Sequence, residues 1–198
     1  MDKIELRTER LTLRPPRWDD VTAITAACQD PELQRRVPVP VPYTRADAED
    51  YVRDFSDRGW SIGTICTWAL IHEGAFSGVV GLEQIRNGQA AIGFWMAPGY
   101  RRRGLLSEAA TRVIDFGFAV PPNGLGLVRI EWHAYAGNLA SARTARRLGF
   151  RFEGMLRLGA AGRDGRQDDW VGGLLLTDDR SPRSWPILDV TPDGALSR

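Results

Sequence analysis

The sequence predicts a single mixed α/β domain built on one β-sheet, and three observations carry that prediction. The chain has 198 residues, of which 43% are hydrophobic and 26% charged, which suits one globular domain with a sizeable core. Helical patterns dominate the first third, three short strand patterns follow in a row, and strand and helix patterns then alternate. That order is typical of helices packed against one sheet.

The first third of the chain opens with one extended segment and is then mostly helical. Apolar residues alternate between Ile4 and Leu13 around a polar turn, and Pro15 and Pro16 end the strand. Thr44 and Asp47 form a capping box for a helix that is predicted to end near Ser56. The predicted helices cover residues 18–28, 31–37 and 45–56. Alternating Val and Pro over 37–42 predict an extended loop.

After Gly63 the pattern changes to short β-branched runs separated by turn residues, among them Asn87-Gly88, a strong hairpin signal. The predicted strands cover residues 64–72, 78–86, 90–96, 127–134, 151–158 and 170–176. Apolar residues at helical spacing predict helices over 104–118 and 139–148, the second ended by Gly149. A Gly-rich turn at 162–165 joins the last two strands.

Composition excludes several classes of protein. Cys28 and Cys66 are the only cysteines and form no CxxC motif, which excludes a disulfide scaffold and a cysteine-rich zinc site. His72 and His133 are far apart in sequence, so no metal site is expected. The formal net charge is +1, and this balance argues against a nucleic-acid partner. No apolar run approaches ~18 residues and the N-terminus lacks a signal-peptide pattern, so we expect no membrane partner and a cytoplasmic protein.

An arginine-rich loop joins the strand that ends at Met96 to the helix that follows Gly104. The first amides of a helix have no acceptor within it and lie at the positive end of its dipole, so they favour an anion such as phosphate. A glycine there would let the backbone approach the anion closely. The alternative is a solvated arginine run that precedes an ordinary helix.

A second strand-to-helix junction carries Asn138 and Ser141. Taken alone, Asn138 reads as a simple N-cap and Ser141 as a first-turn hydroxyl.

Together the two junctions resemble the GNAT superfamily of acyl-CoA-dependent N-acyltransferases, and most of all its RimJ/RimL (ribosomal-protein-alanine N-acetyltransferase) type. The resemblance spans most of the chain. The segments that carry it are Leu6–Arg14, Asp30-Pro31, Gly78–Gly81, Ile92–Trp95, Arg101–Ala109, Asn138–Ser141, Leu148–Phe150 and Glu153-Gly154.

The resemblance implies a GNAT fold, a twisted, mostly antiparallel mixed sheet that splays between its fourth and fifth strands, predicted over 90–96 and 127–134. It implies acetyl-CoA as cosubstrate, its diphosphate on the amides of 102–107 and its pantetheine arm along 94–96. The Met96 amide would bind the thioester carbonyl, and Ser141 would protonate the leaving thiolate directly or through water. The implied cofactor-binding residues are Phe94, Trp95, Met96, Arg101, Arg102, Arg103, Gly104, Leu105, Leu106, Ser107, Asn138 and Ser141.

Two positions depart from the family pattern. Leu106 stands where the phosphate loop usually ends in Gly or Ala, so its side chain must point away from the cofactor or the loop must shift. Ala91 stands where a carboxylate, a common candidate for the base, is frequent. Glu83 and Glu131 remain as candidate bases. The alternative for each is a cross-strand or surface charge without a catalytic role. An α-amine titrates near ~8, so a dedicated base is dispensable.

The acceptor is predicted to be a primary amine, either a protein N-terminus or a small molecule. Its pocket would be shaped by the 37–42 loop and by Trp18, Trp60 and Trp68. The alternative is that these tryptophans belong to the core, as tryptophans more often do. No Asp/Glu cluster suited to a polycation can be placed there from sequence. An arginine near the thioester would favour succinyl-CoA, with Arg36 as a candidate. A non-catalytic acyl-CoA-binding regulator is a further alternative that Ala91 supports.

No cysteine lies in a motif, so we expect direct transfer in a ternary complex rather than through an acyl-enzyme. The predicted domain covers residues 1–178. Residues 179–198 are predicted to be an extension without a fold of its own. Apolar residues at 185–188 are expected either to cover a homodimer surface or to pack on the same domain.

Overall fold

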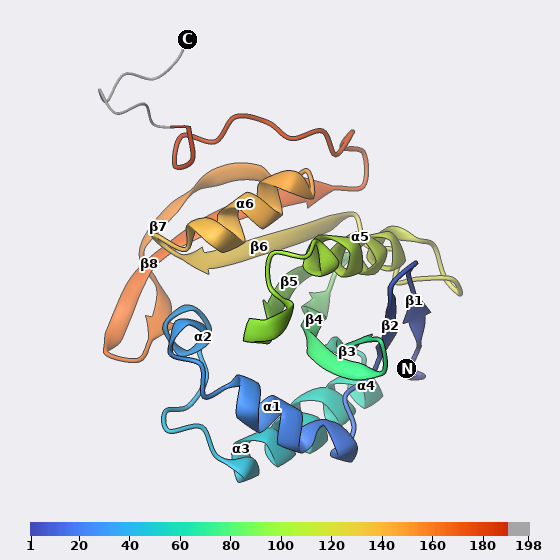
Figure 1. The fold of residues 1–198 in the computed structure, drawn as a ribbon. Coiled ribbons are helices and arrows are strands. Elements are labelled where there is room, and N and C mark those ends of the chain that lie inside the picture. Colours follow the sequence, from blue (N-terminus) through green and yellow to red (C-terminus); the bar gives the residue numbers. More distant parts are fainter. Residues whose placement is uncertain (190–198) are drawn as a thin grey trace.

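The computed structural model describes residues 1–189, which form one eight-stranded sheet with helices on both faces (Figure 1). The strand order is β1-β2-β3-β4-β5-β6-β8-β7. Neighbouring strands are antiparallel except for β5 and β6, which are parallel. The prediction of one mixed, mostly antiparallel sheet is therefore confirmed.

The strands fall close to their predicted positions. They are β1 (Leu6–Arg7), β2 (Leu11–Arg14), β3 (Cys66–His72), β4 (Ala75–Arg86), β5 (Gln89–Met96), β6 (Arg129–Tyr135), β7 (Arg151–Gly162) and β8 (Gly165–Leu175). The β7–β8 hairpin is longer than predicted, because both strands continue to a tight turn at 163–164. The added residues are largely polar or small and carry no alternating apolar pattern that would have marked them as strand.

The helices also follow the predicted order. They are η1 (Trp18–Asp20), α1 (Val21–Ala27), α2 (Pro31–Arg36), α3 (Arg45–Asp50), the π-helical η2 (Tyr51–Asp57), α4 (Arg58–Ile62), η3 (Pro98–Tyr100), α5 (Leu105–Phe118) and α6 (Leu139–Arg147). The helix predicted to end near Ser56 instead continues through η2 and α4. It ends only at Gly63, the C-cap residue, which has a φ of 75°. The predicted end was therefore wrong.

The core is divided between the two faces of the sheet. Helices α5 and α6 bury their apolar sides with the larger cluster, which includes Leu105, Val113 and Ala145. Helices α1, α2 and α3 pack with η2 in a second cluster around Ile24 and Val52. The sheet is thus sandwiched between two sets of helices, and the loops at the β5 and β6 ends lie between them (Figure 1).

The segment after β8 runs back over the domain without a further helix or strand up to residue 189. Trp185 is fully buried there: it packs against Trp132 and Phe152, and its Nε1 donates to the Phe150 carbonyl at 3.2 Å. Of the two expectations for this apolar stretch, packing on its own domain is observed. The domain boundary at 178 and a homodimer stay predictions.

Within residues 1–189, no helix has both the length and the apolar character that a bilayer crossing requires.

Candidate active site

Strands β5 and β6 separate at their carboxyl ends and leave an unpaired backbone edge. Their parallel ladder runs from Gln89 opposite Arg129 to Ile92 opposite Trp132, although β5 continues to Met96 and β6 to Tyr135. The expected splay between these two strands is therefore observed. On the other side of β5, the Ala97 amide donates to the Ser77 carbonyl at 2.9 Å. Because antiparallel bonding alternates, the N–H of Met96 faces the opening rather than β4.

The α5 N-terminus lies just beyond that edge. Gly104 is the N-cap residue, with φ of 77°, and no side chain caps the helix. The amides of the first turn are therefore not used by a capping side chain. Leu106, the departure from the family pattern, packs against the core cluster. Its side chain thus points away from the turn, which is the first of the two predicted outcomes; the other was a shifted loop.

The three loop arginines have different surroundings. The Arg101 guanidinium binds Asp30 and donates to the Met96 carbonyl at 3.1 Å, so it ties the loop to β5. Arg103 reaches His72 Nε2 at 3.1 Å and lies over the Tyr100 ring. Arg102 is exposed and has a φ of 60°. Two of the three side chains therefore have protein partners and brace the loop.

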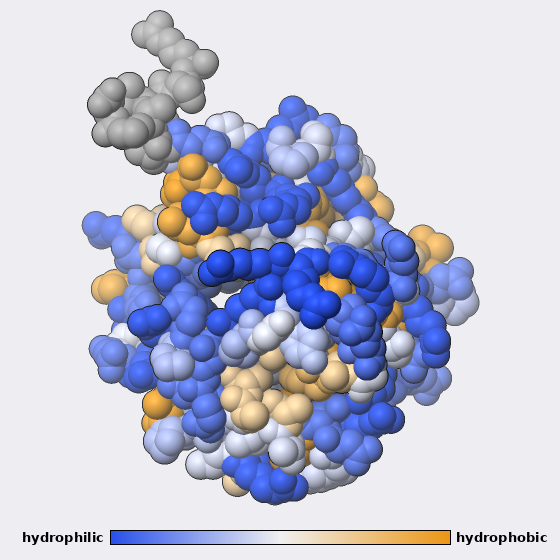
Figure 2. All heavy atoms as spheres, viewed as in Figure 1, coloured by the Kyte–Doolittle hydropathy of each residue, from blue (hydrophilic) through white to orange (hydrophobic). Residues whose placement is uncertain are grey.

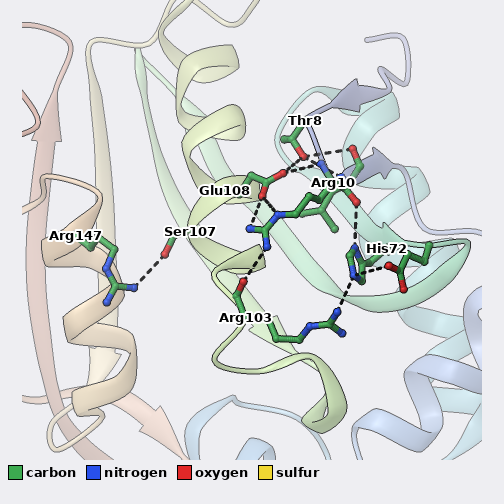
Figure 3. Close-up of polar contacts among 9 residues, drawn as sticks. Thr8, Arg10, His72, Arg103, Ser107, Glu108 and Arg147 are labelled. Carbon is green, nitrogen blue, oxygen red and sulfur yellow. Dashed lines mark hydrogen bonds and ion pairs between the residues drawn. The ribbon is translucent and has the colours of Figure 1, made fainter.

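A contact that the sequence did not predict fixes the start of α5 to the N-terminal hairpin (Figure 3). Glu108 accepts hydrogen bonds from Thr8 and from the Arg10 backbone and side chain, the latter at 2.7 Å from Nε. Burial alone would raise the pKa of Glu108, but these hydrogen bonds and the Arg10 charge lower it. Arg10 also donates to the Arg103 carbonyl at 3.1 Å. Arg10 thereby brings a guanidinium beside the Gly104 turn.

From the other side, Arg147 on α6 reaches toward the same turn, with its Nη1 3.5 Å from the Ser107 hydroxyl (Figure 3). Arg10 and Arg147 come from segments far from the loop in sequence, so no local motif marked them.

Ser141 lies at the second junction, in the first turn of α6. Asn138 is the N-cap residue of that helix, and its side chain accepts from the Ser141 amide at 3.2 Å. The Ser141 hydroxyl oxygen accepts from Trp132 Nε1 at 2.9 Å. Since the indole can only donate, the hydroxyl hydrogen of Ser141 stays available to a second partner. Trp132 was not predicted, because nothing in the sequence links a strand residue to a hydroxyl nine positions later.

A cavity of about 900 Å³ lies on the α1–α3 side of the opening, and Figure 2 shows the surface hollowed between the β6–β8 side of the sheet and the loop before α5. The 37–42 loop contributes residues 37–40 to its wall, as expected. The prediction for three tryptophans was wrong: Trp60 and Trp68 are fully buried in the core and Trp18 is exposed. The aromatic residues that line it are Tyr43, Tyr51, Phe55, Phe94, Trp95 and Tyr135.

The cavity wall is acidic. Its charged residues are Asp47, Asp50, Glu83, Glu131 and Asp169, and no Lys or Arg is found among the described residues that line it. This acidic cluster could not be placed from the sequence, because the carboxylates come from separate elements and meet only in the fold. Arg36, the candidate for an anionic acyl group, does not line the cavity and instead pairs with Glu32 at 3.1 Å.

Both candidate bases flank the position where the expected carboxylate is missing. Ala91 is directly opposite Glu83 on β4 and directly opposite Glu131 on β6. Burial raises the pKa of Glu83, and its Oε1 lies 2.9 Å from where a Cβ of Gly93 would stand. Glu131 is instead paired with Arg129 at 3.0 Å. Glu83 is thus the carboxylate better suited to exchange a proton.

A histidine for which the sequence predicted no catalytic role also lines the cavity. His133 is the first β6 residue beyond the last pair with β5, and its Nδ1 lies 2.7 Å from Asp169 Oδ2 on β8. The two are 36 residues apart in sequence, so only the fold brings them together.

Comparison with known proteins places this geometry in a family. Residues 10–151 match the acetyltransferase (GNAT) domain model. The chain belongs to the GNAT acetyltransferase family. The expected family is thereby confirmed, and the chain is an N-acetyltransferase.

Among its relatives, the uncharacterized N-acetyltransferase p20 of Bacillus licheniformis is 31% identical over 157 residues, covering 77% of this chain and 85% of p20. The uncharacterized N-acetyltransferase YoaA of Bacillus subtilis is 30% identical over 161 residues, with the same coverage of each chain. The GNAT fold is also that of RimL, a ribosomal L7/L12 α-N-protein acetyltransferase solved with coenzyme A. The two structures have a TM-score of 0.77 at 19% identity, covering 88% of this chain and 98% of RimL.

Proposed function

We propose that this GNAT acetyltransferase binds acetyl-CoA across the open edge of β5 and acetylates a primary amine held in the acidic cavity. The observation that carries the proposal is the end of the β5–β6 ladder at Ile92 and Trp132. Beyond that pair, Phe94 and Met96 have no partner on β6, and they lie between the uncapped start of α5 and the cavity. An extended thioester arm needs such an edge, because its amides can then bond as a strand would.

The α5 N-terminus is proposed to take the diphosphate of acetyl-CoA. The amides of 102–107 and the dipole of a 14-residue helix favour an anion there. The positive φ of Gly104 leaves the side facing the anion free of a Cβ. Arg147 adds positive charge beside the turn, whereas Arg10 is paired there with Glu108 and holds the Arg103 carbonyl. The site therefore suits a polyanion better than a neutral ligand.

Three groups are proposed to act at the thioester. The Met96 amide donates to the carbonyl oxygen as it becomes negative, since its N–H faces the opening. The Ser141 hydroxyl, oriented by Trp132, donates a proton to the leaving sulfur directly or through water. Glu83 accepts a proton from the ammonium form of the acceptor, and its raised pKa brings it closer to the range a general base needs.

Transfer is proposed to be direct. Cys28 lines the cavity, but burial raises the pKa of its thiol to about 11, against a smaller opposing effect of a Tyr43 hydrogen bond. Burial likewise raises the pKa of Cys66 to about 12. A thiol that stays protonated near neutral pH is a poor nucleophile, so an acyl-enzyme is disfavoured.

The acceptor is proposed to be cationic, either a protein N-terminus or a small amine. The RimL relationship in fold favours an N-terminus, since RimL acts on ribosomal L7/L12. The acidic wall and the absence of Lys or Arg among the described lining residues favour a small amine with positive charge. The same absence disfavours a succinyl group, which would need a cationic partner.

A thiol-release assay tests the proposal. Acetyl-CoA is supplied with a panel of N-terminal peptides and small amines, and free thiol and acetylated product are measured together. Amine-dependent release with matching product is expected, with succinyl-CoA a poorer donor. The assignment would be overturned if thiol release were the same without amine. It would also be overturned if calorimetry showed no heat of binding for coenzyme A.

A further inference from the structure

We propose that His133, held by Asp169, is a second proton acceptor at the opening between β5 and β6 and takes the proton that the nitrogen loses after it attacks the thioester. This inference rests on the proposed function and adds a step that Glu83 does not cover. His133 lines the cavity with 39% of its side chain exposed, one residue past the last β5–β6 pair. It therefore lies where a thioester along β5 would meet an amine from the cavity.

The hydrogen bond to Asp169 determines which nitrogen can accept. Asp169 is 6% exposed, and its Oδ2 lies 2.7 Å from His133 Nδ1. A carboxylate only accepts, so Nδ1 carries the hydrogen of the neutral ring and Nε2 keeps its lone pair. Asp169 is thus a positioning residue that fixes the tautomer in which Nε2 can take a proton.

Carboxylates on three strands lie around the ring. On β6, Glu131 Oε2 lies 3.7 Å from Nε2. On β8 the facing group is Asp169, whose Oδ2 bonds Nδ1. On β7, Glu153 interacts with His133 by charge and is bonded to Arg129. On β5, Ala91 pairs with Glu131, and neither Ala91 nor Gly93 carries a titratable group.

An ammonium acceptor loses two protons from its nitrogen during the transfer, and the proposal assigns one to each of two acceptors. An ammonium acceptor gives its first proton to Glu83, and the freed electron pair forms the C–N bond with the thioester carbon. The nitrogen is then positive and passes its second proton to Nε2 of His133, while the C–S bond breaks. The sulfur takes one proton from Ser141, which solvent restores. Each turnover therefore releases one proton to solvent.

Replacing His133 by Asn tests the step, since an Asn side chain can still donate to Asp169 but lacks the acceptor at the Nε2 position. With an amine found active for the unchanged protein, kcat is expected to fall about 100-fold, within the usual range for general base catalysis. The KM for acetyl-CoA and the unfolding temperature should stay close to the starting values. Val128→Ala is the control, because Val128 is exposed just before β6 and does not line the cavity, and it should change kcat less than about twofold.

Two further readouts separate proton transfer from a structural role. Free imidazole is expected to restore activity to His133→Ala, in proportion to its unprotonated fraction, since the cavity has room for it. Asp169→Asn should lower kcat and alter the pH dependence of kcat. The inference is overturned if His133→Asn keeps more than half of kcat, or if imidazole leaves His133→Ala unchanged. No amine-dependent turnover by the unchanged protein would instead refute the proposed function itself.

Discussion

Substitution of Gly104 by Ala gives the sharpest test of where acetyl-CoA binds. Gly104 has a φ of 77°, and the nearest atom to an added Cβ is Arg10 Nη2 at 3.5 Å, an ordinary contact. The protein itself can therefore accommodate the methyl group. The cost to folding is the left-handed backbone alone, roughly 1–2 kcal/mol for a residue with a Cβ. In a chain of this size that lowers Tm by about 2–8 °C.

The effect on cofactor binding should be larger than the effect on folding. A Cβ at Gly104 would stand on the side from which the diphosphate approaches, and would displace one or two amide hydrogen bonds to a charged oxygen. Each such bond contributes about 1.5–3 kcal/mol, so the loss in kcat/KM for acetyl-CoA should be about 10–100-fold or more. Acetyl-pantetheine lacks the diphosphate, and its kcat/KM should stay within about twofold.

The assay compares both thioesters at saturating amine by thiol release. Gly99→Ala is the matched control, because it lies in the same connection, has no positive φ and meets nothing within 4 Å of its added Cβ. It should leave both thioesters unaffected. An equal loss for acetyl-CoA and acetyl-pantetheine in Gly104→Ala would refute a diphosphate site at this turn.

Substitutions at three further positions test the proposed site and the core. Glu83→Gln should lower activity below pH 7 more than above it, where an α-amine is already partly neutral; an unchanged pH–rate profile would remove Glu83 as a base. Burial raises the folded-state pKa of Glu83 above its ordinary 4.5, so above that pH the charged carboxylate disfavours folding. Glu83→Gln should therefore also be more stable than the unchanged protein in urea titrations at pH 7. This gain in stability should disappear below pH 4. Trp132→Phe removes the donor to Ser141 and should reduce kcat about fivefold with little change in KM, as expected for a hydrogen bond of about 1 kcal/mol. An unaltered kcat would show that Trp132 does not assist Ser141 in catalysis. Trp185→Ala should cost about 3–5 kcal/mol of unfolding free energy in denaturant melts and Trp185→Phe much less, whereas equal stability of all three proteins would show that Trp185 adds nothing to the core.

Local sequence patterns predicted the elements well and their ends less well. The capping box at Thr44, the Asn138 N-cap and the apolar spacing of α5 depend on residues a few positions apart, and each is observed. The end of the helix after Thr44 was misplaced because no stop residue precedes Gly63. The fully buried Trp60 lies in the continuation, so core packing and not local propensity extends the helix.

The site was predictable where one stretch of chain forms it, and not where several strands meet. Gly104 and the amides after it could be found because a loop and its helix are contiguous. The partners Arg10, Trp132 and Asp169 lie far along the chain from the groups they hold. The acidic wall was missed for the same reason, since each carboxylate alone is compatible with an exposed surface charge.

By itself, the sequence determined the order of strands and helices, the family and the two junctions that start α5 and α6, because these depend on hydrogen bonds and apolar spacing between near neighbours. Only the tertiary structure decided which side chains face the opening in the sheet. Strand register places Glu83 and Glu131 on either side of Ala91 and leaves His133 just beyond the last pair. Register depends on how whole strands pack, and a shift of one residue would turn all of these groups to the opposite face.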